Sequence, residues 1–162
     1  MASSRKRSAG LVVFRIRAGQ AEVLLVHPGG PYWAKKDLGA WSIPKGELDE
    51  GDADELHAAR REFQEELGIE VQGEFTPLAE VRQPSGKVVV PFLVRADVDV
   101  AAIESNSFEM EWPPKSGKLA KFPEVDRAAY FPLAEARQKI LAGQLPILDE
   151  LARFLASGID SP

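Results

Sequence analysis

The first part of the chain alternates short apolar runs with turn residues, which is the pattern of β-strands. Residues 9–16 and 21–27 are rich in aliphatic and β-branched side chains, and they flank a turn-like segment at 17–20. This arrangement predicts a β-hairpin with a four-residue loop. The sequence Pro-Gly-Gly-Pro at 28–31 then ends the second strand, because proline cannot donate to the backbone ladder.

Residues 52–67 have the apolar spacing of an amphipathic helix. Asp52 is suited to accept from the backbone N–H groups of the first turn, with Glu55 as its capping-box partner. Gly68 favours the left-handed conformation that ends many helices. Apolar residues at spacings of three and four predict one buried stripe, formed by Leu56, Ala59, Phe63 and Leu67.

The rest of the chain predicts two extended segments, a long loop, a strand and two helices, in that order. Their ranges are 73–82, 87–98, 105–123, 128–131, 133–142 and 146–156. Strands interleaved with helices indicate an α/β fold in which helices cover both faces of a mixed sheet. We expect one domain over residues 8–157, with flexible ends at 1–7 and 158–162.

Composition narrows the functional classes. A length of 162 residues with 44% hydrophobic and 28% charged residues fits one soluble domain. A net charge of −5 disfavours a broad nucleic-acid-binding face, and the absence of cysteine excludes disulfides and thiol chemistry. The apolar stretch at 11–14 is too short for a signal peptide or a membrane span, so a cytoplasmic protein without a membrane partner is expected. The oligomeric state is left open.

Three glutamates of the predicted helix fall on one patch beside the apolar stripe. This carboxylate cluster consists of Glu62, Glu65 and Glu66. Like charges three and four residues apart destabilise a helix, and Arg61 can relieve only part of the repulsion. A divalent cation such as Mg²⁺, which prefers oxygen ligands, would relieve the rest. A solvated acidic face is the alternative interpretation of the same pattern.

Residues 46–69 resemble the box motif of the Nudix hydrolase family. Arg61-Glu62-Phe63-Gln64-Glu65-Glu66-Leu67-Gly68-Ile69 matches the second half of that motif at every specified position. The first half departs from it in two ways, since Asp52 replaces a glutamate and one extra residue precedes Arg61. The extra residue bears on the family's structural contact between these two positions, for which Asp54 is the alternative to Asp52.

The resemblance implies an α/β/α sandwich with a mixed sheet that hydrolyses phosphoanhydride bonds in nucleoside diphosphate derivatives. Mg²⁺ or Mn²⁺ would be bound by the carboxylate cluster and the Gly46 carbonyl. Among the residues that could act as the base, Glu66 comes first, and Glu124 and Glu111 are the alternatives.

The segment Trp41-Ser-Ile-Pro-Lys45-Gly46 resembles the entry to the box in diadenosine polyphosphate hydrolases. Lys45 is a candidate phosphate ligand, with a solvated loop lysine as the alternative. Trp41 is a candidate for stacking on a base, although a tryptophan in an apolar strand is more often part of the core. His27 ends a strand and is a weaker catalytic candidate.

Two basic stretches stand out in this acidic chain. One is the predicted loop with Lys115, Lys118 and Lys121, which we interpret as a clamp for a phosphate chain. The other contains Tyr32, Trp33, Lys35 and Lys36 and has the same two interpretations, a binding surface or a solvated one.

The substrate expected from these features is a small nucleotide or polyphosphate, with a dinucleoside polyphosphate such as Ap4A, or an NTP, as the first choice. The alternatives are a catalytically weak nucleotide-binding module, a diphosphoinositol polyphosphate hydrolase and an RNA 5′-end pyrophosphohydrolase. Substrate choice in such folds depends on loops outside the motif, so the motif does not decide between these alternatives.

Overall fold

The computed structural model describes residues 7–157, so residues 1–6 of the predicted flexible N-terminus at 1–7, and all of the predicted flexible C-terminus at 158–162, lie outside that range. Arg7, which the sequence placed in the N-terminal end, instead begins the first strand and forms ion pairs with Glu55 and Glu80 at 2.7 and 2.9 Å. The strands are β1 (Arg7–Arg17), β2 (Gln20–Pro28), β3 (Lys45–Glu47), β4 (Thr76–Pro77), β5 (Val81–Arg82), β6 (Val88–Arg95), β7 (Ser107–Glu111), β8 (Leu119–Pro123) and β9 (Val125–Pro132). The helices are α1 (Glu55–Leu67), α2 (Leu133–Lys139) and α3 (Leu145–Ala156), with short 3₁₀ turns η2 (Val100–Ala102) and η3 (Ala142–Gln144).

The predicted β1–β2 hairpin is present, but its turn is tighter than expected. Arg17 pairs with Gln20, so only Ala18 and Gly19 lie between the strands. Both have positive φ, 53° and 78°, as a two-residue primed turn requires. The expected four-residue loop was wrong because the strand register extends to its outer residues.

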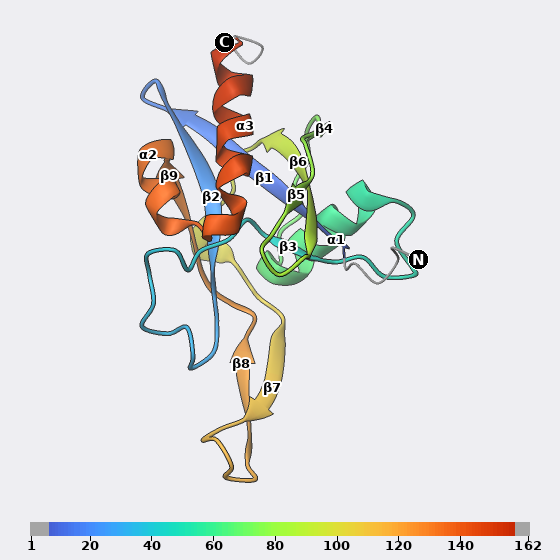
Figure 1. The fold of residues 1–162 in the computed structure, drawn as a ribbon, viewed down its shortest axis with the longest axis vertical. Helices are drawn as coiled ribbons and strands as arrows, with labels where there is room; N and C mark the ends of the chain where they lie inside the picture. The colour runs from blue at the N-terminus through green and yellow to red at the C-terminus, as the bar shows by residue number, and fades with distance from the viewer. Residues whose placement is uncertain (1–6, 158–162) are drawn as a thin grey trace.

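A seven-stranded mixed sheet forms the centre of the molecule (Figure 1). Its main order is β4-β6-β1-β2-β9, with β3 paired to β1 and β5 paired to β6. β1 and β6 run parallel, and the other pairs are antiparallel. The two extended segments predicted at 73–82 and 87–98 become β4, β5 and β6, with β6 the longest of them.

Helices cover both faces of the sheet, as the sequence predicted. Along β1, Leu11 and Val13 belong to the core packed against α1, whereas Val12 and Phe14 belong to the core packed against α2 and α3. This alternation follows from the two-residue period of a strand, and it makes β1 apolar on both sides. Figure 1 shows α1 on one side of the sheet and the two C-terminal helices on the other.

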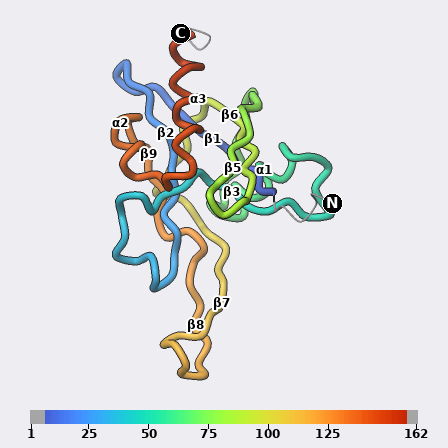
Figure 2. The backbone as a smooth tube through the Cα atoms, viewed as in Figure 1, coloured from blue at the N-terminus to red at the C-terminus, as the bar shows by residue number. Residues whose placement is uncertain are grey.

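The segment predicted as a long loop at 105–123 is a second β-hairpin. β7 and β8 pair with each other from Ser107–Pro123 to Glu111–Leu119 and form a separate two-stranded sheet. Figure 2 shows this hairpin projecting beyond the end of the main sheet. Most of the residues that suggested a loop, the two adjacent prolines, the glycine and two of the lysines, lie in the turn between the strands, and Lys121 lies in β8.

The C-terminal helices match their predicted positions closely. α2 ends at Lys139 rather than at 142, because the chain turns there through η3 before α3 begins at Leu145. Among residues 7–157, no helix has both the length and the apolar character required to cross a membrane.

Candidate active site

α1 carries the carboxylate cluster, and its packing against the sheet fixes how the cluster is oriented. Its buried residues are Ala58, Ala59, Phe63 and Leu67, while the predicted stripe residue Leu56 is only half-buried. Gly68 ends the helix with φ 72°, as predicted. The cap at the other end is Asp54, whose side chain accepts from the His57 N–H at 2.8 Å. The prediction that Asp52 caps the helix was wrong, because that side chain has a different partner.

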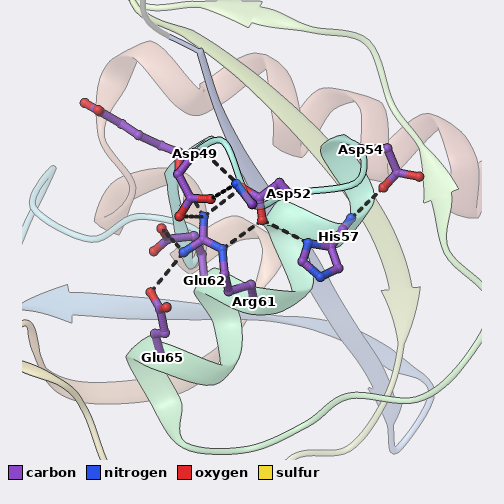
Figure 3. A network of polar contacts seen from close by, with 9 residues as sticks. Asp49, Asp52, Asp54, His57, Arg61, Glu62 and Glu65 are labelled. Atoms are coloured by element: carbon purple, nitrogen blue, oxygen red, sulfur yellow. Dashed lines mark hydrogen bonds and ion pairs between the residues drawn. The ribbon is translucent and has the colours of Figure 1, made fainter.

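Arg61 is the partner of Asp52 and the centre of a charged network (Figure 3). Its Nε and Nη2 donate to the two carboxylate oxygens of Asp52 at 2.8 and 3.0 Å. Its Nη1 donates to Glu62 at 3.0 Å and to Glu65 at 3.1 Å. The structural contact left uncertain by the extra residue is therefore present, and Asp54 does not replace Asp52.

The loop before α1 accommodates the extra residue. Asp52 accepts from the Asp49 backbone N–H at 2.9 Å, and Asp49 accepts from the Gly51 N–H at 2.9 Å. The Asp52 side chain is only 1% exposed, and His57 Nδ1 lies 2.9 Å from it (Figure 3). The Arg61 guanidinium, followed by the Asp49 N–H, holds the pKa of Asp52 well below its usual range.

Gly46, in β3, lies directly against the carboxylate of Glu62. A Cβ atom built on Gly46 would lie 1.9 Å from the Glu62 carboxyl carbon, which is far inside van der Waals contact. Pairing of Gly46 with Ala9 of β1 fixes the backbone at this point. Only glycine therefore lets this strand approach α1 so closely, and the approach brings a backbone segment beside the carboxylate cluster.

Glu66 has the least compensated charge in the cluster. Within residues 7–157, its Oε1 is the one buried side-chain oxygen or nitrogen without a hydrogen-bond partner. Burial, followed by the charges of Glu62 and Glu124, raises the pKa of Glu66 to about 8 against the opposing charge of Lys45. Burial also raises the pKa of Glu62. A cation placed here would therefore meet a buried carboxylate oxygen that has no other partner in the described part of the chain.

Two cavities meet at Glu66. One, of about 200 Å³, is lined in part by Lys45, Glu66, Glu124 and Trp33. The other, of about 340 Å³, is bordered by Glu66, Glu124 and Trp33 again, together with Tyr32, Phe108 and Met110. Lys45 is thus placed at the carboxylate cluster, where burial lowers the pKa of its ammonium.

Two candidate residues belong to the core instead. Trp41 is 4% exposed, its ring packs edge-on against His27 and Phe131, and its Nε1 donates to Asp37 at 2.8 Å. The proposed stacking role of Trp41 on a base was therefore wrong. His27 is fully buried between Asp126 and the Lys36 carbonyl, with its ring nitrogens 2.8 and 2.7 Å from them, so it serves the structure.

The basic loop predicted to clamp phosphate does not line either cavity. Lys115 and Lys118 are exposed in the turn of the β7–β8 hairpin, and Lys121 pairs in register with Glu109. Glu111 accepts from the Gly117 N–H in the same turn at 2.7 Å, which leaves Glu124 as the alternative base beside Glu66.

Sequence reasoning missed the apolar wall of the larger cavity. Phe108 and Met110 alternate with exposed Ser107, Glu109 and Glu111 along β7. This period of two along the sequence was the signal that could have identified a strand with one inward face. The wall faces Tyr32 and Trp33, which are 57% and 36% exposed. Two aromatic side chains thus remain available to a ligand.

The residues present fit a divalent cation in their chemistry. The donor set consists of carboxylates and a backbone carbonyl, which suits Mg²⁺ or Mn²⁺. Among residues 7–157, no three acidic or histidine side chains are yet gathered at metal-binding distance. Arg61 instead holds Glu62 and Glu65 to one side, while Glu66 keeps an unpartnered oxygen.

Comparison with protein families identifies the fold around this site. A family profile described as NUDIX domain matches residues 4–151. This chain belongs to the Nudix family. The expected α/β/α Nudix fold is confirmed, and the chain is a Nudix pyrophosphohydrolase.

Several solved structures are similar to this Nudix chain over most of its length. An Ap4A hydrolase of C. elegans in a binary complex is 25% identical with a TM-score of 0.65, over 94% of this chain and 98% of that one. The NUDIX domain of Shewanella oneidensis NrtR, complexed with ADP ribose, is 19% identical with a TM-score of 0.66, over 93% and 88%. MutT from Aliivibrio salmonicida and Vibrio cholerae is 16% identical with a TM-score of 0.54, over 90% and 94%. The similarity to the last two structures establishes the fold alone. A search of curated protein sequences finds no significant match.

Proposed function

We propose that this Nudix protein hydrolyses a phosphoanhydride bond in a dinucleoside polyphosphate such as Ap4A, using Mg²⁺ or Mn²⁺. The observation that carries the proposal is the position of Glu66. Its buried, unpartnered oxygen borders both the small cavity that contains Lys45 and the larger cavity walled by aromatic side chains. One substrate could therefore place phosphates and a base on either side of the same carboxylate.

The carboxylate cluster and the Gly46 carbonyl would hold the cation. A bound divalent cation withdraws electron density from a bridging phosphate and lowers the pKa of nearby water. The raised pKa of Glu66 reflects a low-dielectric surrounding and the neighbouring charges of Glu62 and Glu124. In that surrounding a cation would favour the ionised carboxylate, which can then accept a proton from the attacking water.

Lys45 would bind the phosphates. Its ammonium borders the same small cavity as Glu66, and a partly desolvated point charge interacts strongly with a phosphate oxygen. Tyr32 and Trp33 offer exposed rings on the wall of the larger cavity, where a nucleobase could stack. Phe108 and Met110 close the opposite side and would exclude water from the base.

The Ap4A hydrolase of C. elegans supports this choice of substrate because the likeness extends over nearly the full length of both chains. The main competitors within the family are cleavage of ADP-ribose, of an NTP or of a diphosphoinositol polyphosphate, and an RNA 5′-end pyrophosphohydrolase. The alternative that is not an enzyme is a nucleotide-binding module without catalytic turnover. The presence of all three glutamates of the carboxylate cluster disfavours it.

A substrate panel tests the proposal. Purified protein is incubated with Ap3A, Ap4A, ADP-ribose, ATP, a diphosphoinositol polyphosphate and a 5′-triphosphorylated RNA, and products are separated by anion-exchange chromatography. Each reaction is run with Mg²⁺, with Mn²⁺ and with excess EDTA. We expect the highest kcat/KM for Ap4A and no turnover in EDTA. Preferred cleavage of another compound would reject the substrate, and full turnover in EDTA would reject the metal.

A further inference from the structure

A third cavity, of a different character from the two at Glu66, lies on the face of the sheet that packs against α2. It has a volume of about 540 Å³ and lies between the segment 34–37, β9 and the end of α2. Four of its lining residues are cations, and we call it the basic groove after them: Lys35, Lys36, Arg127 and Lys139. Asp37 is the one carboxylate in its lining. In a chain of net charge −5, this is a local concentration of positive charge.

The carboxylates near the basic groove are already engaged. Asp37 accepts from Lys139 Nζ at 2.5 Å and from Trp41 Nε1 at 2.8 Å. The Lys139 ammonium, followed by the Trp41 N–H, keeps the pKa of Asp37 below its usual value. Lys35 and Lys36 form no ion pair with any residue between 7 and 157. Their charges remain available to an anion from outside.

The frame of the basic groove is well anchored. The Lys36 carbonyl accepts from buried His27 at 2.7 Å, and the Gly39 N–H donates to the Gln138 carbonyl at 3.0 Å. The Arg127 guanidinium lies 5.3 Å from the centre of the buried Trp41 ring. The backbone of the groove and the Arg127 side chain are thus positioned before an anion binds, which lowers the entropic cost of binding.

Trp33 connects the basic groove to the active site. Its side chain borders both cavities that meet at Glu66, and the next residue, Ala34, already lines the groove. The Lys36 ammonium lies 5.1 Å from the centre of the Trp33 ring. A phosphate chain that leaves the carboxylate cluster past Trp33 would therefore meet Lys36 next.

We propose that the basic groove is a distal phosphate site, which binds the phosphates of a polyphosphate substrate that lie beyond the bond being cleaved. This inference rests on the proposed function, and it replaces the hairpin lysines as the clamp for a phosphate chain. The hairpin is the poorer candidate because Lys115, Lys118 and Lys121 share it with Glu109 and Glu111. Lys36, by contrast, lies beside Trp33, which borders both cavities at Glu66.

The test removes the two free charges of the groove in the double variant Lys35→Gln/Lys36→Gln. The matched comparison is Lys115→Gln/Lys118→Gln, which makes the same charge change in the hairpin turn. Binding of inorganic tripolyphosphate is measured by isothermal titration calorimetry in EDTA at low and high salt. We expect the groove variant to bind at least about threefold more weakly at low salt, the hairpin variant to bind like the wild type, and high salt to remove the difference. Equal loss in both variants, or loss in neither, would overturn the proposal.

Kinetics separate this proposal from the proposed function. The KM of the wild type for Ap3A, Ap4A and Ap5A should fall with each added phosphate, and the groove variant should lose that trend. A wild type that cleaves all three with equal KM would reject the groove and leave the function standing. Tripolyphosphate binding that depends on Lys35 and Lys36, in a protein that cleaves no dinucleoside polyphosphate, would support the groove and reject the substrate.

Discussion

On the acidic face of α1, Arg61 and Glu66 lie little more than one helical turn apart. The carboxylates beside Arg61 are paired, whereas the carboxylate of Glu66 is not fully paired. At Arg61 every neighbouring carboxylate has a partner, including Asp52 with a two-point contact. At Glu66 one buried oxygen has none within residues 7–157. The comparison indicates that the first end holds the loop and helix together, whereas the second end is left incomplete for a ligand.

Removal of the charge at the incomplete end should have the largest effect. Glu66→Gln is expected to lower the turnover of the preferred substrate by at least about a hundredfold, because a charge that acts in the transition state is lost. Its melting temperature should stay the same or rise, since a buried repulsive charge is removed. Steady-state kinetics and differential scanning calorimetry measure both. Glu70→Gln, at the exposed end beyond the helix, is the control. Normal turnover in Glu66→Gln would contradict the comparison.

A methyl group beside the cluster should have the next largest effect. Gly46→Ala places a Cβ atom 1.9 Å from the Glu62 carboxyl carbon, so the carboxylate must move away from the site. Turnover should fall at least about tenfold, the scale of a misplaced catalytic group. The control is Gly51→Ala, whose Cβ would meet only the Asp49 carboxylate, at 3.4 Å. If the two variants had the same kcat, contact between Gly46 and Glu62 would have no functional meaning.

At the Arg61 end, where the carboxylates are paired, removal of a charge should lower the stability of the fold. Asp52→Asn breaks the two-point ion pair with Arg61 and should lower the urea midpoint of unfolding at neutral pH. Because the folded-state pKa of Asp52 is depressed, its contribution is present above the unfolded pKa of about 3.9 and disappears as the pH falls through the folded value. Urea unfolding at pH 7 and in acid measures this difference. Asp49→Asn, which alters an exposed contact of 3.6 Å, should change little.

The pH dependence of metal-free stability should show the smallest effect. The folded pKa of Glu66 is raised to about 8, so below about 4.5 both folded and unfolded states are protonated and no cost arises. As the pH rises from 4.5 to 8 the unfolded state releases its proton first, and the folded protein loses stability. In EDTA, Glu66→Gln should therefore gain at least about 1 kcal/mol relative to wild type between pH 5 and 8. Parallel stability curves for the two proteins would contradict the burial of an uncompensated charge.

The position of the carboxylate cluster could be predicted from the sequence because it depends on local spacing. The glutamates, Gly68 and the buried face of α1 all follow from the period of a helix, and the structure agrees with them. The first turn was misplaced because Asp52 and Asp54 are both good capping residues. Their roles were decided by which one reached Arg61 across the loop.

The aromatic and basic residues around the site were assigned less well. Trp41 and the hairpin lysines were proposed to bind substrate, and the structure instead places Trp33, Phe108 and Met110 at the cavities. Trp33 and Trp41 both lie between β2 and β3, and no local pattern distinguishes their environments. Only the packing of β9 and α2 against one of them decides which is buried.

By itself, the sequence determined the helix that carries the chemistry, the β1–β2 hairpin and the family to which the chain belongs. These features depend on residues that are near each other along the chain, where helical and strand periods restrict the possible geometry. The tertiary structure alone decided that Gly46 lies against Glu62, that Glu66 keeps an unpartnered oxygen, and that a groove of cations opens beyond Trp33. Each of these features joins segments distant in sequence, so it depends on how the sheet and helices pack rather than on any local pattern.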